Sequence, residues 1–277
     1  MQLIIQGTEV ENYDLRSLAK LARTDQIEKI TGQAFRLRNI QQQDGIADYC
    51  KNVNLDFAFI NTNQALSDFK LIAMDMDSTL LAIESIDEVA DMHHIKQHVA
   101  EITLKTMRGE ISFEESLTQR TALLRGLHAD ALQKVYDERV RLSPGAETLL
   151  KKARNAGLKT MVISGGFTFF TDRIKERLKL DFAAANTLEI KDNTLTGKVL
   201  GKILGRKGKA EALEHVCNKH AIERKQVIAI GDGANDLDMM AAAGVSIAYH
   251  AKPIVQDNAT YSINHVGLDG VINLFDE

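Results

Sequence analysis

Two aspartates one residue apart follow an apolar run, where residues 71–80 read LIAMDMDSTL. Residues two apart on a strand point the same way, so Asp75 and Asp77 would direct both carboxylates into one small volume. Two close carboxylates repel each other unless they share a proton or a cation neutralises them. The alternative is a helix N-cap at Asp77 or Ser78, which explains one acid and leaves the other unexplained. The pair therefore indicates either a cation site or a helix start.

A second acidic turn occurs in IAIGDGANDLDMM, where Asp232, Asn235 and Asp236 precede a predicted helix. Carboxylates at a tight strand-to-helix turn suit a hard divalent cation, which prefers oxygen ligands. Gly and Asn also favour a solvent-exposed Asx-turn that holds no ion. Because two acidic turns each end an apolar strand, the metal site is the favoured interpretation.

Groups that could hold an anion occur at two further places. The run MVISGGF ends in Ser164, Gly165 and Gly166, whose hydroxyl and N–H groups could hold phosphate oxygens, although a plain turn has the same signature. Lys207 and Lys209 open the predicted helix of GRKGKAEAL. A lysine there is unfavourable for the helix dipole, and a bound phosphate would explain it. Taken alone, however, a lysine cluster is more typical of a solvated face.

A parallel sheet would bring these residues together. Three runs, at 70–77, 158–166 and 224–233, are almost continuously apolar before a polar or glycine-rich end, as in strands buried on both faces. Weaker runs at 245–249 and 261–264 add two candidate strands, and the intervals have helical spacing. We therefore predict an α/β fold with a Rossmann-like parallel sheet.

The chain divides by pattern into three parts. Residues 1–68 predict a small α+β module, and residues 69–277 predict the sheet domain, with a boundary in the polar segment 62–68. No strand pattern occurs between about 84 and 141, so an α-helical cap is expected there, at the carboxyl end of the first strand where ligands of such sheets bind. In this cap Ser112 and Glu115 form a predicted capping box. The elements expected in the module are strands at 2–6, 33–39 and 56–61 and helices at 14–25 and 42–53.

Composition and charge narrow the class of partner. The 277 residues are 44 % apolar and 26 % charged, as in ordinary soluble domains. A net charge of -4 argues against nucleic acid, although a pocket can still be locally positive. The sequence shows no secretory signal and no apolar run of membrane-spanning length, and its two cysteines fit a reducing compartment. We expect a cytoplasmic protein without a nucleic-acid or membrane partner; a homodimer is left open.

Four motifs in a fixed order, namely DMDST, the Ser164 strand end, a lysine that opens a helix, and GDGAND, resemble the haloacid dehalogenase (HAD) superfamily. From residue 71 to about the C-terminus the chain is most similar to the phosphoserine phosphatase family of that superfamily. The segments that carry this are DMDSTLLAIESIDEVA, MRGEISFEESLTQRTALL, VISGGF and AIGDGANDLDMMAAAGVSIAYHAKP. The resemblance implies a HAD fold and Mg²⁺-dependent hydrolysis of phosphoserine through an aspartyl-phosphate, the last step of serine biosynthesis. The alternative is a phosphotransferase, or a phosphatase for another small phosphomonoester such as phosphohomoserine.

The resemblance also implies a role for each motif residue. Asp75 would be the nucleophile and Asp77 the general acid and base. Mg²⁺ would bind the Asp75 carboxylate, the Asp77 backbone carbonyl and the Asp232 carboxylate. The phosphoryl group would be held by Ser164, the Gly165 N–H and Lys209, the last chosen over its neighbour at 207 because KAEAL fits the family's lysine-led helix better.

Substrate choice is expected to come from the cap. Glu84 and Arg120 match the positions that bind the ammonium and carboxylate groups of phosphoserine, and Phe113 matches an apolar position that shields the closed site. Without the family resemblance, Glu84 and Arg120 would be typical of charges on an exposed helix, and Phe113 would be typical of a core residue. Asn235 would orient substrate or the acidic loop, and Asp236 would support the metal site. The N-terminal module loosely resembles small amino-acid-sensing domains, although it is predicted with one strand too few; a regulatory role is a hypothesis.

Overall fold

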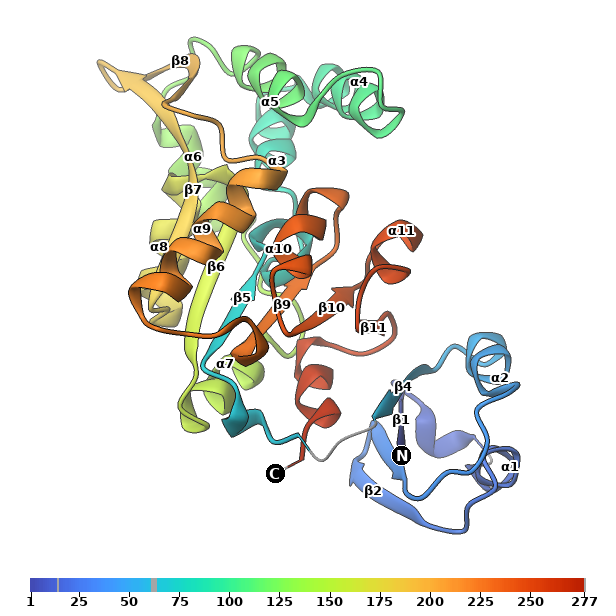
Figure 1. The fold of residues 1–277 in the computed structure, drawn as a ribbon. Coiled ribbons are helices and arrows are strands. Elements are labelled where there is room, and N and C mark those ends of the chain that lie inside the picture. The colour runs from blue at the N-terminus through green and yellow to red at the C-terminus, as the bar shows by residue number, and fades with distance from the viewer. Residues whose placement is uncertain (14, 61–63, 277) are drawn as a thin grey trace.

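The computed structural model describes residues 1–13, 15–60 and 64–276, and its larger sheet has the strand order β11-β10-β9-β5-β6-β7-β8 (Figure 1). Every neighbouring pair in this sheet is parallel except β7 with β8. The predicted α/β fold with a Rossmann-like parallel sheet is confirmed. The strands are β5 (Leu71–Met74), β6 (Lys159–Phe167), β7 (Phe182–Lys191), β8 (Thr194–Leu200), β9 (Val227–Gly231), β10 (Val245–Tyr249) and β11 (Tyr261–Ile263).

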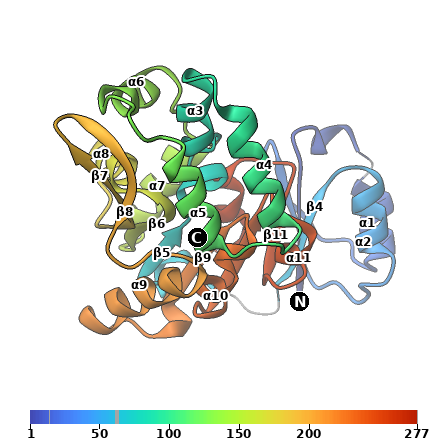
Figure 2. The same ribbon diagram turned by 90° about the horizontal axis from the view of Figure 1, so that it is seen from above.

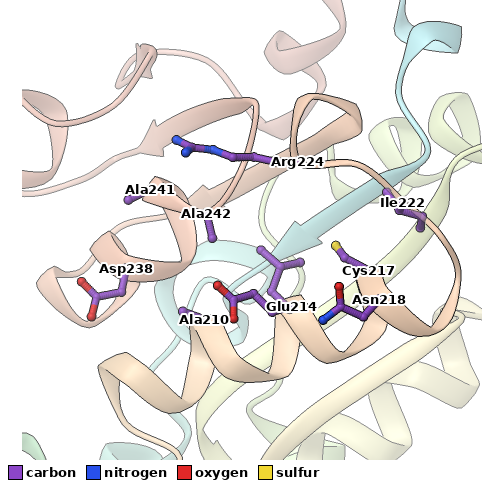
Figure 3. A pocket seen from close by; sticks show the side chains of 10 residues that line it. Ala210, Glu214, Cys217, Asn218, Ile222, Arg224, Asp238, Ala241 and Ala242 are labelled. Carbon is purple, nitrogen blue, oxygen red and sulfur yellow. The ribbon is translucent and has the colours of Figure 1, made fainter.

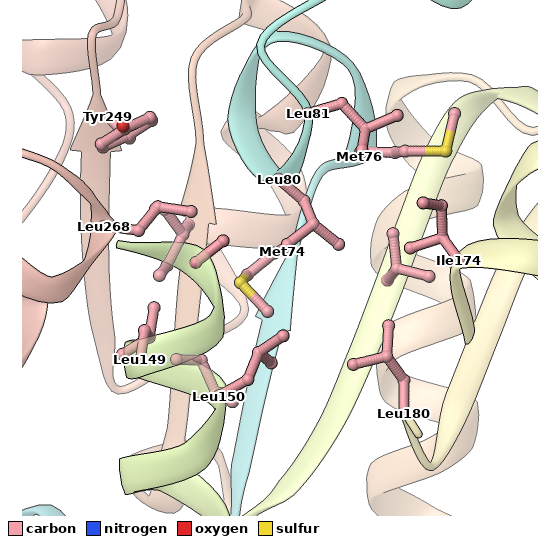
Figure 4. Packing of buried hydrophobic residues seen from close by; sticks show 14 of the residues in the cluster. Met74, Met76, Leu80, Leu81, Leu149, Leu150, Ile174, Leu180, Tyr249 and Leu268 are labelled. Carbon is pink, nitrogen blue, oxygen red and sulfur yellow. The ribbon is translucent and has the colours of Figure 1, made fainter. Parts of the chain in front are cut away.

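Strand β5 is buried on both faces, which explains its unbroken apolar run. Ile72 and Met74 belong to one apolar cluster with residues of α7 and α8, and Figure 4 shows Met74 in it. Leu71 and Ala73 belong to a second cluster with residues of α9 and α10. Each such side chain contributes about 1.5–3 kcal/mol when fully buried. The helices beside the sheet are α7 (Ala146–Asn155), α8 (Thr168–Leu178), α9 (Arg206–Lys219), α10 (Leu237–Ala241) and α11 (Pro253–Gln256).

The expected α-helical cap follows β5, and its helices lie together in Figures 1 and 2. The Ser112 Oγ accepts a hydrogen bond from the Glu115 backbone N at 3.1 Å, as the capping-box pattern predicts. The cap helices are α3 (Ser85–Met92), α4 (Lys96–Met107), α5 (Phe113–Ala122) and α6 (Asp130–Glu138). Among the described residues, no helix combines the length and the apolar character needed to cross a bilayer.

The β7–β8 hairpin is not predicted by the sequence analysis. Its two strands are half-exposed, and they are joined at Asp192 and Asn193, which both have positive φ. A two-residue turn of this kind between alternating runs is a hairpin signal, and it is the signal that a search for continuously apolar strands misses. The hairpin is bonded to the cap through three backbone hydrogen bonds: Gly126 N to Leu195 O, Leu195 N to Leu127 O, and Ala129 N to Asn193 O.

The N-terminal module has four antiparallel strands in the order β2-β3-β1-β4, so the expectation of three strands is wrong. The missed strand, β2, is an exposed edge with little apolar content. The helix expected at 14–25 runs over 15–21, position 14 lies outside the described residues, and so do positions 62 and 63 of the expected boundary. The elements are β1 (Gln2–Gln6), α1 (Leu15–Leu21), β2 (Ile27–Thr31), β3 (Ala34–Leu37), α2 (Ile46–Asn52) and β4 (Asp56–Ile60).

One face of this small sheet packs on its own helices, and the other packs on the sheet domain. The buried Asp56 carboxylate accepts hydrogen bonds from the backbone N of Asn264 at 2.7 Å and of His265 at 2.8 Å, directly after β11. Arg36, also buried, pairs with Asp276. The module is therefore attached through buried polar contacts as well as through apolar packing.

Candidate active site

One buried lysine joins two of the acids. Lys209 lies in the first turn of α9, and its Nζ is 2.7 Å from Asp75 Oδ2 and 2.7 Å from Asp236 Oδ1. Asp75 follows β5 and Asp236 follows β9, and these strands are neighbours in the sheet. Burial by itself lowers the pKa of Lys209, but the carboxylates of Asp236 and Asp75 outweigh it, and the net effect is a raised pKa. Lys209 therefore keeps its positive charge although it is buried, whereas Lys207 is exposed.

Three carboxylates gather at the same sheet edge. Asp75, Asp232 and Asp236 each offer an oxygen atom, and these atoms lie within 4.8 Å of one another. Burial, followed by the charge of Asp236, raises the pKa of Asp232 to about 6. Burial also raises the pKa of Asp75, although Lys209 opposes the shift. Such a set of crowded oxygens could hold a metal ion, which would relieve the repulsion.

Both carboxylate oxygens of Asp236 accept hydrogen bonds from within the protein. Its Oδ1 accepts from Lys209, and its Oδ2 accepts from the backbone N of Gly233 at 3.0 Å and of Asp232 at 3.2 Å. It therefore shapes the turn that presents Asp232. From the opposite side, the fully buried Thr79 donates its Oγ1 hydrogen to Asp232 Oδ1 at 2.9 Å, which fixes the orientation of that carboxylate.

Asp77 lies in an irregular turn between β5 and the cap. The following residue, Ser78, has φ of 57°, so the chain reverses sharply here. The Asp77 carboxylate accepts hydrogen bonds from the backbone N and the Oγ of Ser85, both at 3.0 Å. The alternative of a helix N-cap at Asp77 or Ser78 is wrong, because α3 begins at Ser85 with Glu84 as its N-cap, and Asp77 reaches the first N–H of this helix from eight residues away. Burial and then the charge of Glu84 raise the pKa of Asp77 to about 8, against the hydrogen bonds from Ser85.

The end of β6 brings Ser164 to this edge, where it is buried. Its Oγ accepts from the Gly166 backbone N at 2.8 Å, so its hydroxyl hydrogen is left for another acceptor. Asn186 of β7, also buried, donates from Nδ2 to the carbonyl oxygens of Gly165 at 2.9 Å and of Leu204 at 3.3 Å, and accepts from the Leu204 backbone N. One amide therefore joins the Ser164 turn to the segment that leads into the Lys209 helix.

Of the expected cap residues, Phe113 packs inward and Glu84 lies at the rim. A Cβ added to Gly165 would lie 2.6 Å from Phe113 Cζ, and one added to Gly205 would lie 3.2 Å from Phe113 Cδ1, so the ring packs on both glycines. Glu84 accepts a hydrogen bond from the Ser78 Oγ at 2.6 Å while remaining exposed to solvent. The cap is therefore closed over the strand ends, with a carboxylate at its rim.

Arg120 of α5 brings a half-buried cation to the cap. Its Nε is buried and has no hydrogen-bond partner among the described residues. Burial lowers the pKa of its guanidinium, and the charges of Asp87, Glu84 and Asp77 oppose that shift, so all three acids lie within electrostatic range. The arrangement leaves a planar donor group available to an anion that enters the site.

Asn235 belongs to the acidic turn after β9. It lies half-buried in the turn after β9, and its Oδ1 folds against the backbone of Gly233. The residues that the sequence analysis missed are Thr79, Ser85 and Asn186. Thr79 stands inside the DMDST motif and could have been singled out there, whereas the other two show no local signal because their partners are distant in sequence.

A separate groove of about 720 Å³ lies between α9 and α10 (Figure 3). Glu214, Arg224 and Asp238 are among its lining residues, and none of the expected site residues lines it. None of the residues that line the groove belongs to the carboxylate cluster. We therefore place the candidate active site at the strand ends, where the acids, Lys209 and the cap meet.

Comparison with known proteins shows the family to which the chain belongs. The model of the haloacid dehalogenase-like hydrolase family matches residues 72–241. The chain belongs to this family. A second model, of a domain of unknown function (DUF4072), matches residues 3–46 of the N-terminal module of the HAD hydrolase.

Relatives of this HAD hydrolase include phosphoserine phosphatases. The phosphoserine phosphatase of Polaromonas sp. is 50 % identical over 76 % of this chain and 91 % of its own length. A HAD family hydrolase from Salmonella enterica has a similar structure, with a TM-score of 0.89 and 31 % identity, over 100 % of this chain and 98 % of that one. A phospho-aspartyl intermediate analogue of phosphoserine phosphatase has a TM-score of 0.71 and 39 % identity, over 75 % of this chain and 99 % of that one.

Proposed function

We propose that this HAD hydrolase is a phosphoserine phosphatase, which releases serine and inorganic phosphate, and that this is the last step of serine biosynthesis in the cytoplasm. The observation that carries the proposal is the buried Arg120 Nε, which has no hydrogen-bond partner among the described residues, in a closed cap above a buried Asp75–Lys209 pair. A phosphomonoester with its own carboxylate would satisfy both ends of such a site. The 50 % identity to a phosphoserine phosphatase supports the same substrate.

In the first step, a carboxylate oxygen of Asp75 attacks phosphorus. A bond forms between that oxygen and phosphorus, and the bond between phosphorus and the serine oxygen breaks. The protonated Asp77 carboxyl gives its proton to the departing oxygen, so serine leaves as the neutral alcohol. The raised pKa of Asp77, about 8, keeps the proton available near neutral pH.

In the second step, Asp77 acts in the opposite direction. Its carboxylate takes a proton from a water molecule as the water oxygen attacks phosphorus, and the bond from phosphorus to Asp75 breaks. Phosphate leaves, and both acids return to their starting states. During both displacements, Lys209, the Ser164 hydroxyl and the Gly165 N–H stabilise the negative charge on the phosphoryl oxygens.

We assign Mg²⁺ to the carboxylate cluster, with Asp75, the Asp77 backbone carbonyl and Asp232 as protein ligands. The donor set fits this ion, because carboxylate oxygens within 4.8 Å of one another suit a hard cation. When bound, Mg²⁺ would neutralise the charge that otherwise keeps a phosphate dianion away from Asp75. We predict that EDTA removes activity and that added Mg²⁺ restores it.

The cap supplies recognition of the serine part in this proposal. Arg120 would bind the substrate carboxylate through two parallel N–H donors, and Glu84 would pair with the ammonium group. Phe113, which packs on Gly165, would exclude water from the reacting phosphate. Asn235 would orient the acidic turn or the substrate.

A substrate panel tests the proposal. With Mg²⁺ present, kcat/KM is measured for phosphoserine, phosphothreonine, phosphohomoserine and sugar phosphates, and phosphoserine is expected to be the best substrate. Asp75→Asn should abolish turnover of all of them, whereas Asp257→Asn, at an exposed surface acid, should leave turnover unchanged. A sugar phosphate with the highest kcat/KM would refute the substrate, and an active Asp75→Asn variant would refute the nucleophile.

A phosphotransferase would show itself in the same assay when an alcohol such as homoserine is added. Hydrolysis predicts serine and inorganic phosphate in equal amounts. A shortfall of phosphate, matched by phosphorylated alcohol, would instead support phosphotransfer as the main activity.

A further inference from the structure

Ser85 binds the Asp77 carboxylate with two groups at once. It is fully buried, its backbone N lies 3.0 Å from Asp77 Oδ1, and its Oγ lies 3.0 Å from Asp77 Oδ2. Asp77 belongs to the turn after β5, and Ser85 begins α3, the first helix of the cap. The proposed proton carrier is therefore held from the cap side, by a residue that none of the motifs singles out.

The backbone N–H and the hydroxyl of Ser85 differ in the hydrogen bonds that they can make with the two oxygens of Asp77. A backbone N–H can only donate, so Oδ1 keeps one hydrogen bond from Ser85 whatever the charge of Asp77. A serine hydroxyl can donate or accept. The Ser85 Oγ can therefore donate to Oδ2 when the carboxylate is charged and accept from it when Oδ2 carries the proton.

The position of Gly166 shows which way Oδ2 faces. A Cβ added at Gly166 would lie 2.8 Å from Asp77 Oδ2, 3.0 Å from Ser164 Oγ and 3.3 Å from Ser85 Oγ. The three oxygens therefore lie together on one side of Gly166, and Oδ2 is on the same side as the hydroxyl proposed to hold phosphate. Asp77 Oδ2, whose partner Ser85 Oγ can both donate and accept, is therefore the oxygen on the side of the proposed phosphate site.

We propose that Ser85 is a positioning residue of the phosphatase reaction, which fixes the Asp77 carboxyl so that Oδ2 is the atom that delivers and receives the proton. This inference rests on the proposed function. A purely structural role, as the first residue of α3, would instead affect folding and substrate binding and would not depend on the leaving group.

The test compares leaving groups in Ser85→Ala, which loses the hydroxyl and keeps the backbone N–H. The serine oxygen needs a proton to leave, whereas 4-nitrophenolate does not. General acid catalysis contributes roughly 10²–10⁴-fold, so we expect the single-turnover rate of phosphoserine cleavage to fall by about 10-fold or more. The burst of 4-nitrophenolate from 4-nitrophenyl phosphate should stay within about twofold of wild type, and KM for phosphoserine should be unchanged.

Three variants complete the experiment. Ser85→Thr keeps the hydroxyl and should restore the phosphoserine rate, and Ser85→Cys, with a weaker donor of similar size, should fall between the two. Ser116→Ala is the matched control, because Ser116 is an equally buried serine in the cap whose Oγ has no hydrogen-bond partner in the part of the chain that the structure describes. Its rates should equal those of wild type.

Equal losses on both substrates, a raised KM with unchanged single-turnover rate, or wild-type rates in Ser85→Ala would each overturn the role of Ser85. If Ser85→Ala does not fold, the same comparison with Ser85→Cys decides. Wild-type protein that fails to cleave phosphoserine would overturn the proposed function, and with it this inference, and that failure is recognised before any variant is made.

Discussion

Replacing Lys209 by Met tests whether the buried cation is what allows the acids to share the site. Met has a similar length and no charge, so Lys209→Met leaves Asp75 and Asp236 without the Nζ that lies 2.7 Å from each. Removing one partner from a buried ion pair costs about 3–5 kcal/mol. With a urea m value of about 1–3 kcal/mol/M, a loss of this size lowers the unfolding midpoint by roughly 1–5 M.

The assay is urea unfolding in EDTA and again in Mg²⁺. In EDTA, Lys209→Met should show the full loss, and Mg²⁺ should recover part of it because it neutralises the same carboxylates. Adding Asp236→Asn to Lys209→Met removes one uncompensated charge and should return stability to the variant, so the pair should be strongly non-additive. Lys207→Met is the matched control, since Lys207 is exposed on the same helix turn.

Identical midpoints for wild type and Lys209→Met in EDTA would refute the reasoning. That result would mean that the acids are accommodated without the lysine, by protonation or by solvent. A midpoint that falls as far in the Lys207→Met control would attribute the loss to the helix terminus and not to the ion pair.

Three further predictions follow from single contacts. Arg120→Ala should raise KM for phosphoserine by about 10- to 100-fold, since a charge-assisted hydrogen bond contributes about 1.5–3 kcal/mol. KM for 4-nitrophenyl phosphate, which has no carboxylate, should stay nearly unchanged. Equal effects on both substrates would show that Arg120 does not bind the substrate carboxylate. Asn186→Ala should lower kcat by roughly 10-fold or more, because it frees both segments that we propose to hold phosphate, while Asn193→Ala at the exposed hairpin turn should not. For Asp181, burial raises the pKa, but hydrogen bonds from Lys159 and Thr160 outweigh it and the net pKa is lowered. Its stabilisation is therefore fully present above the unfolded-state pKa of about 3.9 and is lost as pH falls through the lower folded-state pKa. Asp181→Asn should cost about 1–3 kcal/mol at pH 7, and the difference between the urea midpoints of the two proteins should shrink as pH falls below about 3.9.

Much of the sheet can be predicted from sequence because its central strands are buried on both faces. Strand β5 and strand β9 show uninterrupted apolar runs, and each ends in an acid that the parallel topology brings to one edge. The strands that escape prediction, β2 and the β7–β8 pair, are half-exposed, so their residues alternate weakly and resemble loops. The signal disappears where one face of a strand meets solvent.

The candidate site divides in the same way. Asp75, Ser164 and Lys209 stand in local motifs at strand ends and helix starts, so residue type and spacing point to them. Asn186 and Ser85 act through partners 21 and 8 residues away, across strands or between turn and helix. These contacts form only when the chain folds, and no local sequence motif marks the residues that make them.

The three backbone hydrogen bonds between the loop after α5 and the β7–β8 hairpin make the cap a composite part. The loop after α5 and the β7–β8 hairpin are far apart in sequence but are hydrogen-bonded to each other, so exchanging one of them alone would disrupt these bonds. A chimaera that receives only residues 84–141 from another HAD hydrolase would place foreign loop geometry against a native hairpin. The natural unit for grafting a new specificity onto this scaffold is therefore the cap together with residues 182–200, transferred as one piece.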